Sequence, residues 1–167
     1  LYKQLFDLLS KKEPIDVLKE RLGFYESSGN YKCVNSLGYL GKYQFGMARL
    51  SDIGYTELKK GKTGYYQSDY DWKNGYSKEI FLNTPEIQEQ AFLKHFENWK
   101  KYILVNYSEI LGTIRYGVKL NIATLFLALH FAGPKGLRLF LDYGSDSADA
   151  YGNGLKSYMK KFEDIEI

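Results

Sequence analysis

The sequence predicts a mainly helical protein of one domain. Apolar residues recur at helical spacing along most of the chain, and no long stretch shows the alternation of a half-buried strand. The segment LNIATLFLALHF is apolar on nearly every side, which is typical of a central buried helix. With 167 residues the chain is long enough to enclose one sizeable core, so we expect one domain over residues 1–167.

The N-terminal part is expected to contain two helices, a loop and a third helix. LYKQLFDLLSKK is short and amphipathic. The second helix begins at Pro14, whose missing N–H costs nothing in a first turn, and ends near Gly29. Residues 30–45 are rich in Gly, Asn, Ser and Tyr, which favours a loop with room for a small β-hairpin. MARLSDIG then resumes helical character.

The C-terminal part alternates between an irregular segment and strong helices. Residues 61–83 carry glycines and bulky aromatics without clean periodicity, which predicts a long ordered loop or a broken helix. Thr84 and Pro85 begin the next helix as cap and first-turn residue. After the apolar run, AGPKG breaks the helix before GLRLFLDYG starts another. The last predicted helix has an apolar stripe of Leu155, Tyr158, Met159 and Phe162.

The composition narrows the classes of function. The net charge is +3 with no basic run and no nucleic-acid motif, so no nucleic-acid partner is expected. A single cysteine excludes an internal disulfide, and no His/Cys spacing supports a metal or other cofactor. The longest apolar run is too short to span a bilayer. The 16 tyrosines suit a groove that stacks sugars or bases, and they equally suit plain packing.

Glu26 departs from the pattern of its helix. Ile15, Leu18 and Leu22 form the apolar stripe, and at ~100° per residue Glu26 falls about 20° from Ile15 around the helix. A carboxyl group that loses water favours its neutral form, and it then has a proton to deliver to a leaving oxygen. The alternative interpretation is that Glu26 turns out to solvent at a fraying helix end.

Three short motifs follow one another at a family's spacing. Glu26-Ser27 is separated by a loop from Gly38-Tyr39-Leu40-Gly41-Lys42-Tyr43-Gln44, and LHFAGPKG occupies residues 129–136. These resemble the Glu-Ser, Gly-x-x-Gly-Leu-Met-Gln and Ala-Tyr-Asn-Ala-Gly-Pro-Gly elements of the soluble lytic transglycosylases and related lysozyme-like muramidases. TPEIQEQAF and residues 148–162 also resemble later segments of bacterial and phage relatives, so the resemblance covers residues 15–162.

The resemblance implies a lysozyme-like domain with a substrate groove and an activity on peptidoglycan. Glu26 would protonate the glycosidic oxygen between N-acetylmuramic acid and N-acetylglucosamine and then act as a base on the muramic hydroxymethyl group. This closes an anhydro ring, so no second carboxylate is required. A lysozyme-type hydrolase would need one, and Asp52, Asp69 and Asp71 are the nearest candidates in sequence.

Further residues are predicted to bind substrate, each with a structural alternative. Ser27 bonds near Glu26 or bonds its own helix backbone. Gly41 and Gly133 allow close approach of a sugar or simply form turns. Gln44 offers an amide, and Tyr43 steadies developing charge or stacks on a ring.

Aromatic residues of the irregular segment and one histidine complete the predicted binding set. Tyr66 and Trp72, with their neighbours Tyr65 and Tyr70, either line the groove or anchor their own loop. His130 stands in the third motif, where His130-Phe131 replaces Tyr-Asn of the family pattern. The other departure is Lys42-Tyr43 in place of Leu-Met.

Two further classes of function stay open from the sequence. The altered third motif motivates a glycan-binding module that kept the fold and lost turnover. The aromatic residues and the slight positive charge alone prompt a nucleic-acid binder. For the favoured enzyme we expect glycan strands as partner and a place in the periplasm or outside the cell. The sequence leaves open whether the domain serves wall remodelling, a secretion system, a phage assembly or a toxin.

Overall fold

The computed structural model describes residues 1–9 and 11–167. Over these residues the chain forms seven α-helices and two antiparallel sheets of two strands each, and 54% of it is helical. Helix therefore dominates, as the sequence predicts. None of the helices in the described part is long and apolar enough to cross a membrane.

The chain divides into two compact units. The inserted unit comprises residues 20–98, and the terminal unit comprises residues 1–19 and 99–167. The boundaries fall inside the two helices α2 (Pro14–Ser27) and α5 (Pro85–Tyr107). One domain over residues 1–167 therefore stays a prediction.

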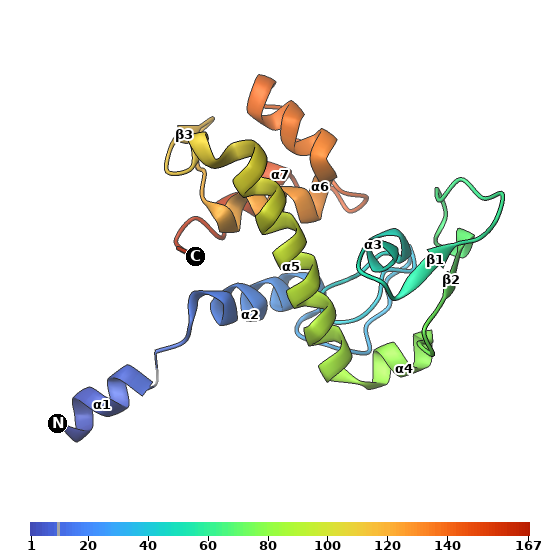
Figure 1. The fold of residues 1–167 in the computed structure, drawn as a ribbon. Coiled ribbons are helices and arrows are strands. Elements are labelled where there is room, and N and C mark those ends of the chain that lie inside the picture. The colour runs from blue at the N-terminus through green and yellow to red at the C-terminus, as the bar shows by residue number, and fades with distance from the viewer. Residues whose placement is uncertain (10) are drawn as a thin grey trace. The chain divides into compact units, whose positions relative to one another are not determined.

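The inserted unit combines short helices with a small sheet (Figure 1). Besides parts of α2 and α5, it contains α3 (Met47–Asp52), β1 (Thr56–Leu58), the 3₁₀ turn η1 (Gln67–Asp69), β2 (Tyr70–Trp72) and α4 (Lys78–Asn83). The two strands pair antiparallel, with Thr56 opposite Trp72, and α3 packs against β1. The core is aromatic, and its largest fully buried side chains are Tyr43, Tyr55, Phe45, Phe81 and Phe92.

The predicted hairpin within residues 30–45 does not form regular strands. Isolated bridges join Val34 to Leu40 and Leu40 to Phe45 instead. Positive φ angles at Gly38, at Gly41 and at Gln44 turn the chain too often for a ladder to extend. The hairpins form at β1–β2 and further along the chain, where strands of two or three residues are too short to show alternation in sequence.

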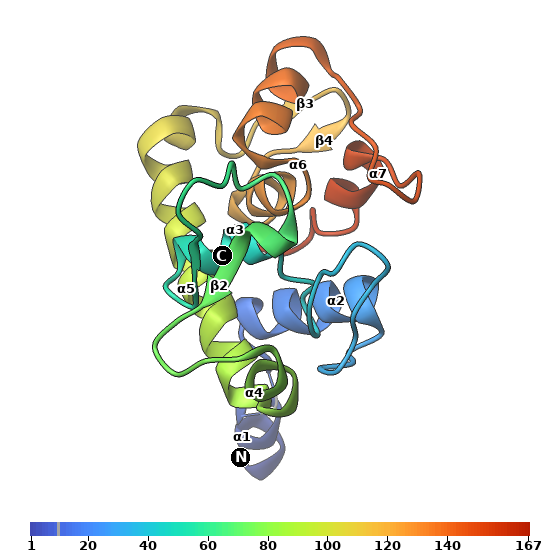
Figure 2. The ribbon, with the colours of Figure 1, turned by 90° about the vertical axis from the view of Figure 1, so that its right-hand side faces the viewer.

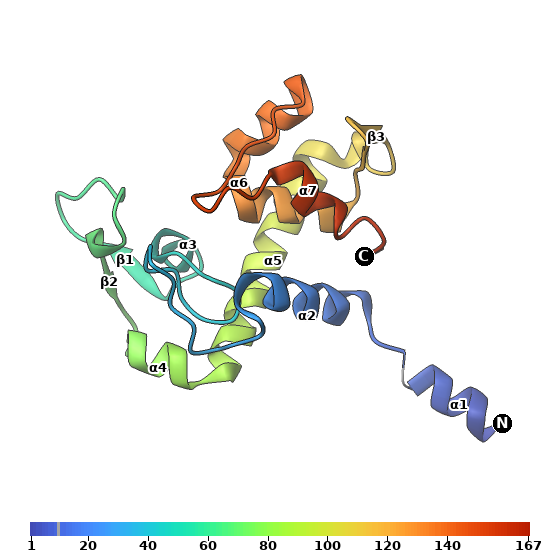
Figure 3. The ribbon, with the colours of Figure 1, turned by 180° about the vertical axis from the view of Figure 1, so that it is seen from behind.

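The terminal unit is built around α6 (Ile122–Tyr143). Its other elements are α1 (Tyr2–Leu9), η2 (Ser108–Ile110), β3 (Ile114–Arg115), β4 (Val118–Lys119), α7 (Leu155–Lys160) and the remaining parts of α2 and α5. Both Figure 1 and Figure 3 show α7 beside α6, and these helices pack on each other. The β3–β4 hairpin lies near α6 in Figure 2, and the Tyr116 hydroxyl of its turn donates to the carbonyl oxygen of Asp142 at 3.1 Å.

Helix α6 follows the sequence prediction closely. Residues 123–129 are buried on every side, none of them more than 1% exposed. At its start the Asn121 side chain accepts from the Thr124 backbone N–H at 2.9 Å. The predicted break falls at Gly133, whose φ of 67° and ψ of −177° kink the helix before Pro134.

Candidate active site

Glu26 lies in the last turn of α2, one residue before the helix ends. Its side chain is half-buried, one turn beyond the fully buried Leu22. In the same turn the rings of Phe24 and Tyr25 are 64% and 43% exposed and meet edge to face at 5.5 Å. The apolar stripe of the helix therefore ends in a carboxyl group at the border between core and solvent, beside two exposed rings.

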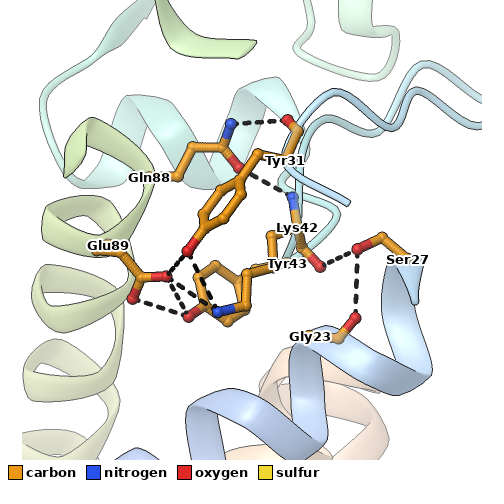
Figure 4. A network of polar contacts seen from close by, with 7 residues as sticks. All are labelled: Gly23, Ser27, Tyr31, Lys42, Tyr43, Gln88 and Glu89. Atoms are coloured by element: carbon orange, nitrogen blue, oxygen red, sulfur yellow. Dashed lines mark hydrogen bonds and ion pairs between the residues drawn. The ribbon is translucent and has the colours of Figure 1, made fainter. Parts of the chain in front are cut away.

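Ser27 joins the end of α2 to the second motif (Figure 4). Its hydroxyl lies 3.2 Å from the carbonyl oxygen of Gly23, one turn back in the helix, and 2.8 Å from the carbonyl oxygen of Lys42. The first contact is the local backbone bond that was one of its two predicted roles. The second contact fastens residues 38–44, called the motif loop below, to the helix turn that carries Glu26.

The motif loop is shaped by a buried glutamine of α5. Gln88 is fully buried, its Oε1 accepts from the Lys42 backbone N–H at 2.9 Å, and its Nε2 donates to the carbonyl oxygens of Tyr31 and Phe81 at 2.8 Å each. Gly41 has a φ of +77°, and a Cβ there would lie 2.1 Å from Oε1 of Gln88. The close approach at Gly41 is therefore made by the protein's own side chain.

Tyr43 and Gln44 both turn inward in this loop. The Tyr43 ring is fully buried and packs at 4.6 Å from the ring of Phe92, so it has no exposed face on which a sugar could stack. Gln44 is 8% exposed with a φ of 51°, and its Nε2 donates to the carbonyl oxygen of Gly41 at 2.9 Å. Its amide donor closes its own turn.

The carboxylate of Glu89 on α5 accepts hydrogen bonds from three donors (Figure 4). It accepts from the hydroxyl of Tyr31 at 2.7 Å, from the hydroxyl of Tyr43 at 2.9 Å and from Nζ of Lys42 at 3.1 Å. The side chains of Lys42 and Glu89 are only 14% and 24% exposed. The stem of Lys42 crosses α2 at Gly23, where a Cβ would lie 2.5 Å from its Cε. This partly buried pair holds the motif loop against α5.

The Glu89 network gives a physical reason for one departure from the family pattern. Lys42 and Tyr43 stand where the resembled motif has Leu and Met, and the polar ends of both side chains reach Glu89. Gln88 had a sequence signal, because it lies three residues before Ala91 and so interrupts a buried helical face. Glu89 had no signal in the sequence, because its three donors lie far from it along the chain and meet it only in the folded protein.

The three acidic residues considered as partners of Glu26 have local roles. Asp52 and Asp71 are 59% and 64% exposed, and each forms an ion pair with a neighbouring cation. Asp69 is buried, and its Oδ2 accepts from the backbone N–H groups of Gly64 and Tyr66 at 3.1 and 3.2 Å. Asp69 therefore shapes the loop that precedes β2.

The aromatic residues of this loop fall into two pairs. Tyr65 and Tyr66 are 83% and 64% exposed, with ring centroids 4.9 Å apart. Trp72 is half-buried against Phe81 at 5.6 Å, and the Tyr70 hydroxyl donates to a carbonyl of its own loop at 3.3 Å. The first pair presents rings to solvent, whereas the second anchors the loop, so the anchoring interpretation holds for Tyr70 and Trp72 and groove lining by Tyr66 stays a prediction.

His130 and Gly133 belong to the terminal unit, whereas Glu26 belongs to the inserted unit. The half-buried His130 ring stacks on Phe126 within α6, with centroids 6.1 Å apart. A Cβ on Gly133 would meet no atom within 4 Å, so its positive φ alone requires glycine there. A groove shared by these residues and Glu26 stays a prediction.

The residues that the structure describes contain no group of three or more His, Cys, Asp or Glu that could hold a metal ion.

Comparisons of the chain with models of protein families, with curated proteins and with solved structures give no match. The assignment of function therefore depends on the motifs and on the geometry around Glu26.

Glu89→Gln is expected to lower the free energy of unfolding by about 2 kcal/mol, because a charged acceptor of three donors is lost and the Lys42 ammonium is left without this carboxylate. Urea denaturation measures the change. Glu86→Gln is the matched control, since Glu86 is exposed in the first turn of the same helix and should shift stability by no more than about 0.5 kcal/mol. Equal losses in the two variants would contradict a role of the network.

Proposed function

We propose that the chain cleaves peptidoglycan as a lytic transglycosylase with a lysozyme-like fold, between N-acetylmuramic acid and N-acetylglucosamine. The observation that carries this proposal is the position of Glu26, half-buried in the last turn of α2 where Ser27 ties that turn to the Gly41–Gln44 motif. A carboxyl group at the border of the core is held in place by its helix and can still reach a substrate.

In the proposed reaction Glu26 acts first as an acid and then as a base. It gives its proton to the glycosidic oxygen as the bond to C1 of the muramic sugar breaks, which produces an oxocarbenium-like state. The carboxylate then takes the proton of the C6 hydroxyl of the same sugar, whose oxygen bonds to C1. The products are a 1,6-anhydro end and a free hydroxyl on the departing sugar, and Glu26 has regained its proton.

The surroundings of the other carboxylates favour this route over hydrolysis. A retaining hydrolase needs a second carboxylate about 5–5.5 Å from the acid, and an inverting one about 6.5–9.5 Å. Asp52 and Asp71 are exposed and ion-paired, Asp69 caps a loop, and Glu89 accepts from Lys42 and two tyrosines. An internal hydroxyl nucleophile makes a second carboxylate unnecessary.

In this proposal exposed aromatic rings stack on the sugars, because the ring of Tyr43 is buried. Phe24 and Tyr25 lie in the turn that carries Glu26, and their exposed faces suit the apolar faces of sugar rings. Tyr66 presents a further exposed ring in the inserted unit. The substrate would be reached in the periplasm or outside the cell.

Mass spectrometry of muropeptides released from purified cell walls tests the proposal. We expect fragments that end in anhydromuramic acid and are lighter by one water than hydrolysis products. Reducing ends would instead identify the runner-up, a lysozyme-type hydrolase. Binding to walls without any released fragment would identify a glycan-binding module. If the protein neither binds walls nor releases fragments, peptidoglycan is excluded as its partner.

A further inference from the structure

The terminal unit contains a pocket of about 340 Å³ that the proposed cleavage reaction does not use. It lies where the C-terminal end of α5, strand β3 and the last turns of α6 meet, and its lining includes Tyr102, Tyr107, Arg115, Arg138 and Asp142. Pockets that bind small molecules begin at about 300 Å³, so this one suits a ligand at the small end of that range.

Two guanidinium groups from different elements converge on this pocket. The half-buried Arg115 projects from β3, and its Nη1 donates to the carbonyl oxygen of Leu141 at 3.3 Å, which fixes it against α6. Arg138 is exposed on α6, and its positive charge acts on the nearby hydroxyl of Tyr107. Among the described residues neither arginine forms an ion pair.

Tyr102 and Tyr107 also line the pocket, and their hydroxyl groups are hydrogen-bond donors beside the two arginines. The rings of Tyr102 and Tyr107 meet edge to face, with centroids 6.0 Å apart. Burial raises the pKa of Tyr107 above its ordinary value and the neighbouring Tyr102 adds to this, while Arg138 opposes it. The phenol therefore stays protonated at neutral pH and keeps a proton to donate.

The charge of the lining is positive, because its two arginines face one carboxylate, Asp142, which is exposed at the end of α6. Planar guanidinium groups bind carboxylate and phosphate oxygens in pairs of parallel hydrogen bonds. The side chains of Ile110 and Leu141 add an apolar part to the same lining.

We propose that this pocket binds a small ligand through a carboxylate or phosphate group, which Arg115, Arg138 and the Tyr107 hydroxyl hold. The rest of the ligand lies against Tyr102, Ile110 and Leu141. Asp142 opposes the anion and limits its affinity. The site is independent of cleavage at Glu26.

NMR titration of the full chain at constant ionic strength tests this proposal with three probes. Inorganic phosphate and N-acetylalanine represent the two sources of anionic oxygen, and N-acetylalanine amide has the same shape without the charge. We expect saturable shifts of backbone amides in residues 102–115 and 138–142 with phosphate, with N-acetylalanine or with both, and none with the amide. The absence of saturation with both anions would overturn the proposal, as would equal binding of the amide.

Three variants distinguish binding of the anion at this pocket from its nonspecific attraction to the positive charge of the protein. Arg138→Gln is expected to weaken binding about tenfold or more, because a charge-assisted contact is lost. Lys135→Gln removes the same charge from an exposed position of α6 outside the pocket lining and should leave binding unchanged. Asp142→Asn should tighten binding, since the opposing carboxylate is gone. Equal weakening by the two cation variants, or no gain from Asp142→Asn, would contradict the assigned site.

Discussion

Glu26→Gln is expected to lower the rate of cell-wall cleavage by about 10²- to 10⁴-fold, which is the usual contribution of a positioned acid or base. Glutamine keeps the shape of the side chain but has no proton to give at neutral pH. In the proposed route the same group must also take a proton from the muramic hydroxyl, so both steps fail together. Loss of turbidity of purified walls, with counted release of muropeptides, measures the effect.

The matched control for this variant is Glu57→Gln. Glu57 is exposed on β1 in the same unit, and its replacement removes the same charge. It should cleave walls at the rate of the unaltered protein. Circular dichroism and the thermal midpoint show whether the Glu26 variant is folded. A folded Glu26→Gln protein that clears walls at full speed would exclude Glu26 as the acid.

The helices could be predicted from the sequence because their signals are local. Pro14 and Pro85 each begin a helix where first-turn geometry allows proline, and Gly133 breaks α6 where a positive φ is needed. The strands could not be predicted in this way. β1 and β3 have three and two residues, and each is defined by its partner rather than by its own pattern.

The candidate site shows the same division between local and distant signals. The place of Glu26 at the end of a helical stripe follows from spacing along one helix. The contacts of Lys42 with Gln88 and Glu89 span more than forty residues, and no periodicity within one element indicates them. The burial of Tyr43 depends on Phe92 from the same distant helix, so the sequence could not show that its ring has no free face for a sugar.

Gly41→Ala is expected to cause the largest loss of stability, about 3–5 kcal/mol in the free energy of unfolding. The backbone at φ +77° costs roughly 1–2 kcal/mol for a residue with a Cβ. The new methyl group would lie 2.1 Å from Oε1 of Gln88, so the buried amide must move. At least one of the three backbone groups that Gln88 serves, the Lys42 N–H and two carbonyl oxygens, then loses its partner, at about 1–3 kcal/mol for a buried group left unpaired.

Gly75→Ala separates the clash from the backbone strain. Gly75 has the same φ of +77° in the same unit, but a Cβ there meets nothing within 4 Å, so only the cost of about 1–2 kcal/mol remains. Urea denaturation of both variants therefore isolates the contribution of Gln88. Adding Gln88→Ala to Gly41→Ala should cost less than the sum of the single changes, because the two changes remove one contact. Equal losses at the two glycines, or strict additivity with Gln88, would mean that Gln88 does not hold the motif loop in place beside Glu26.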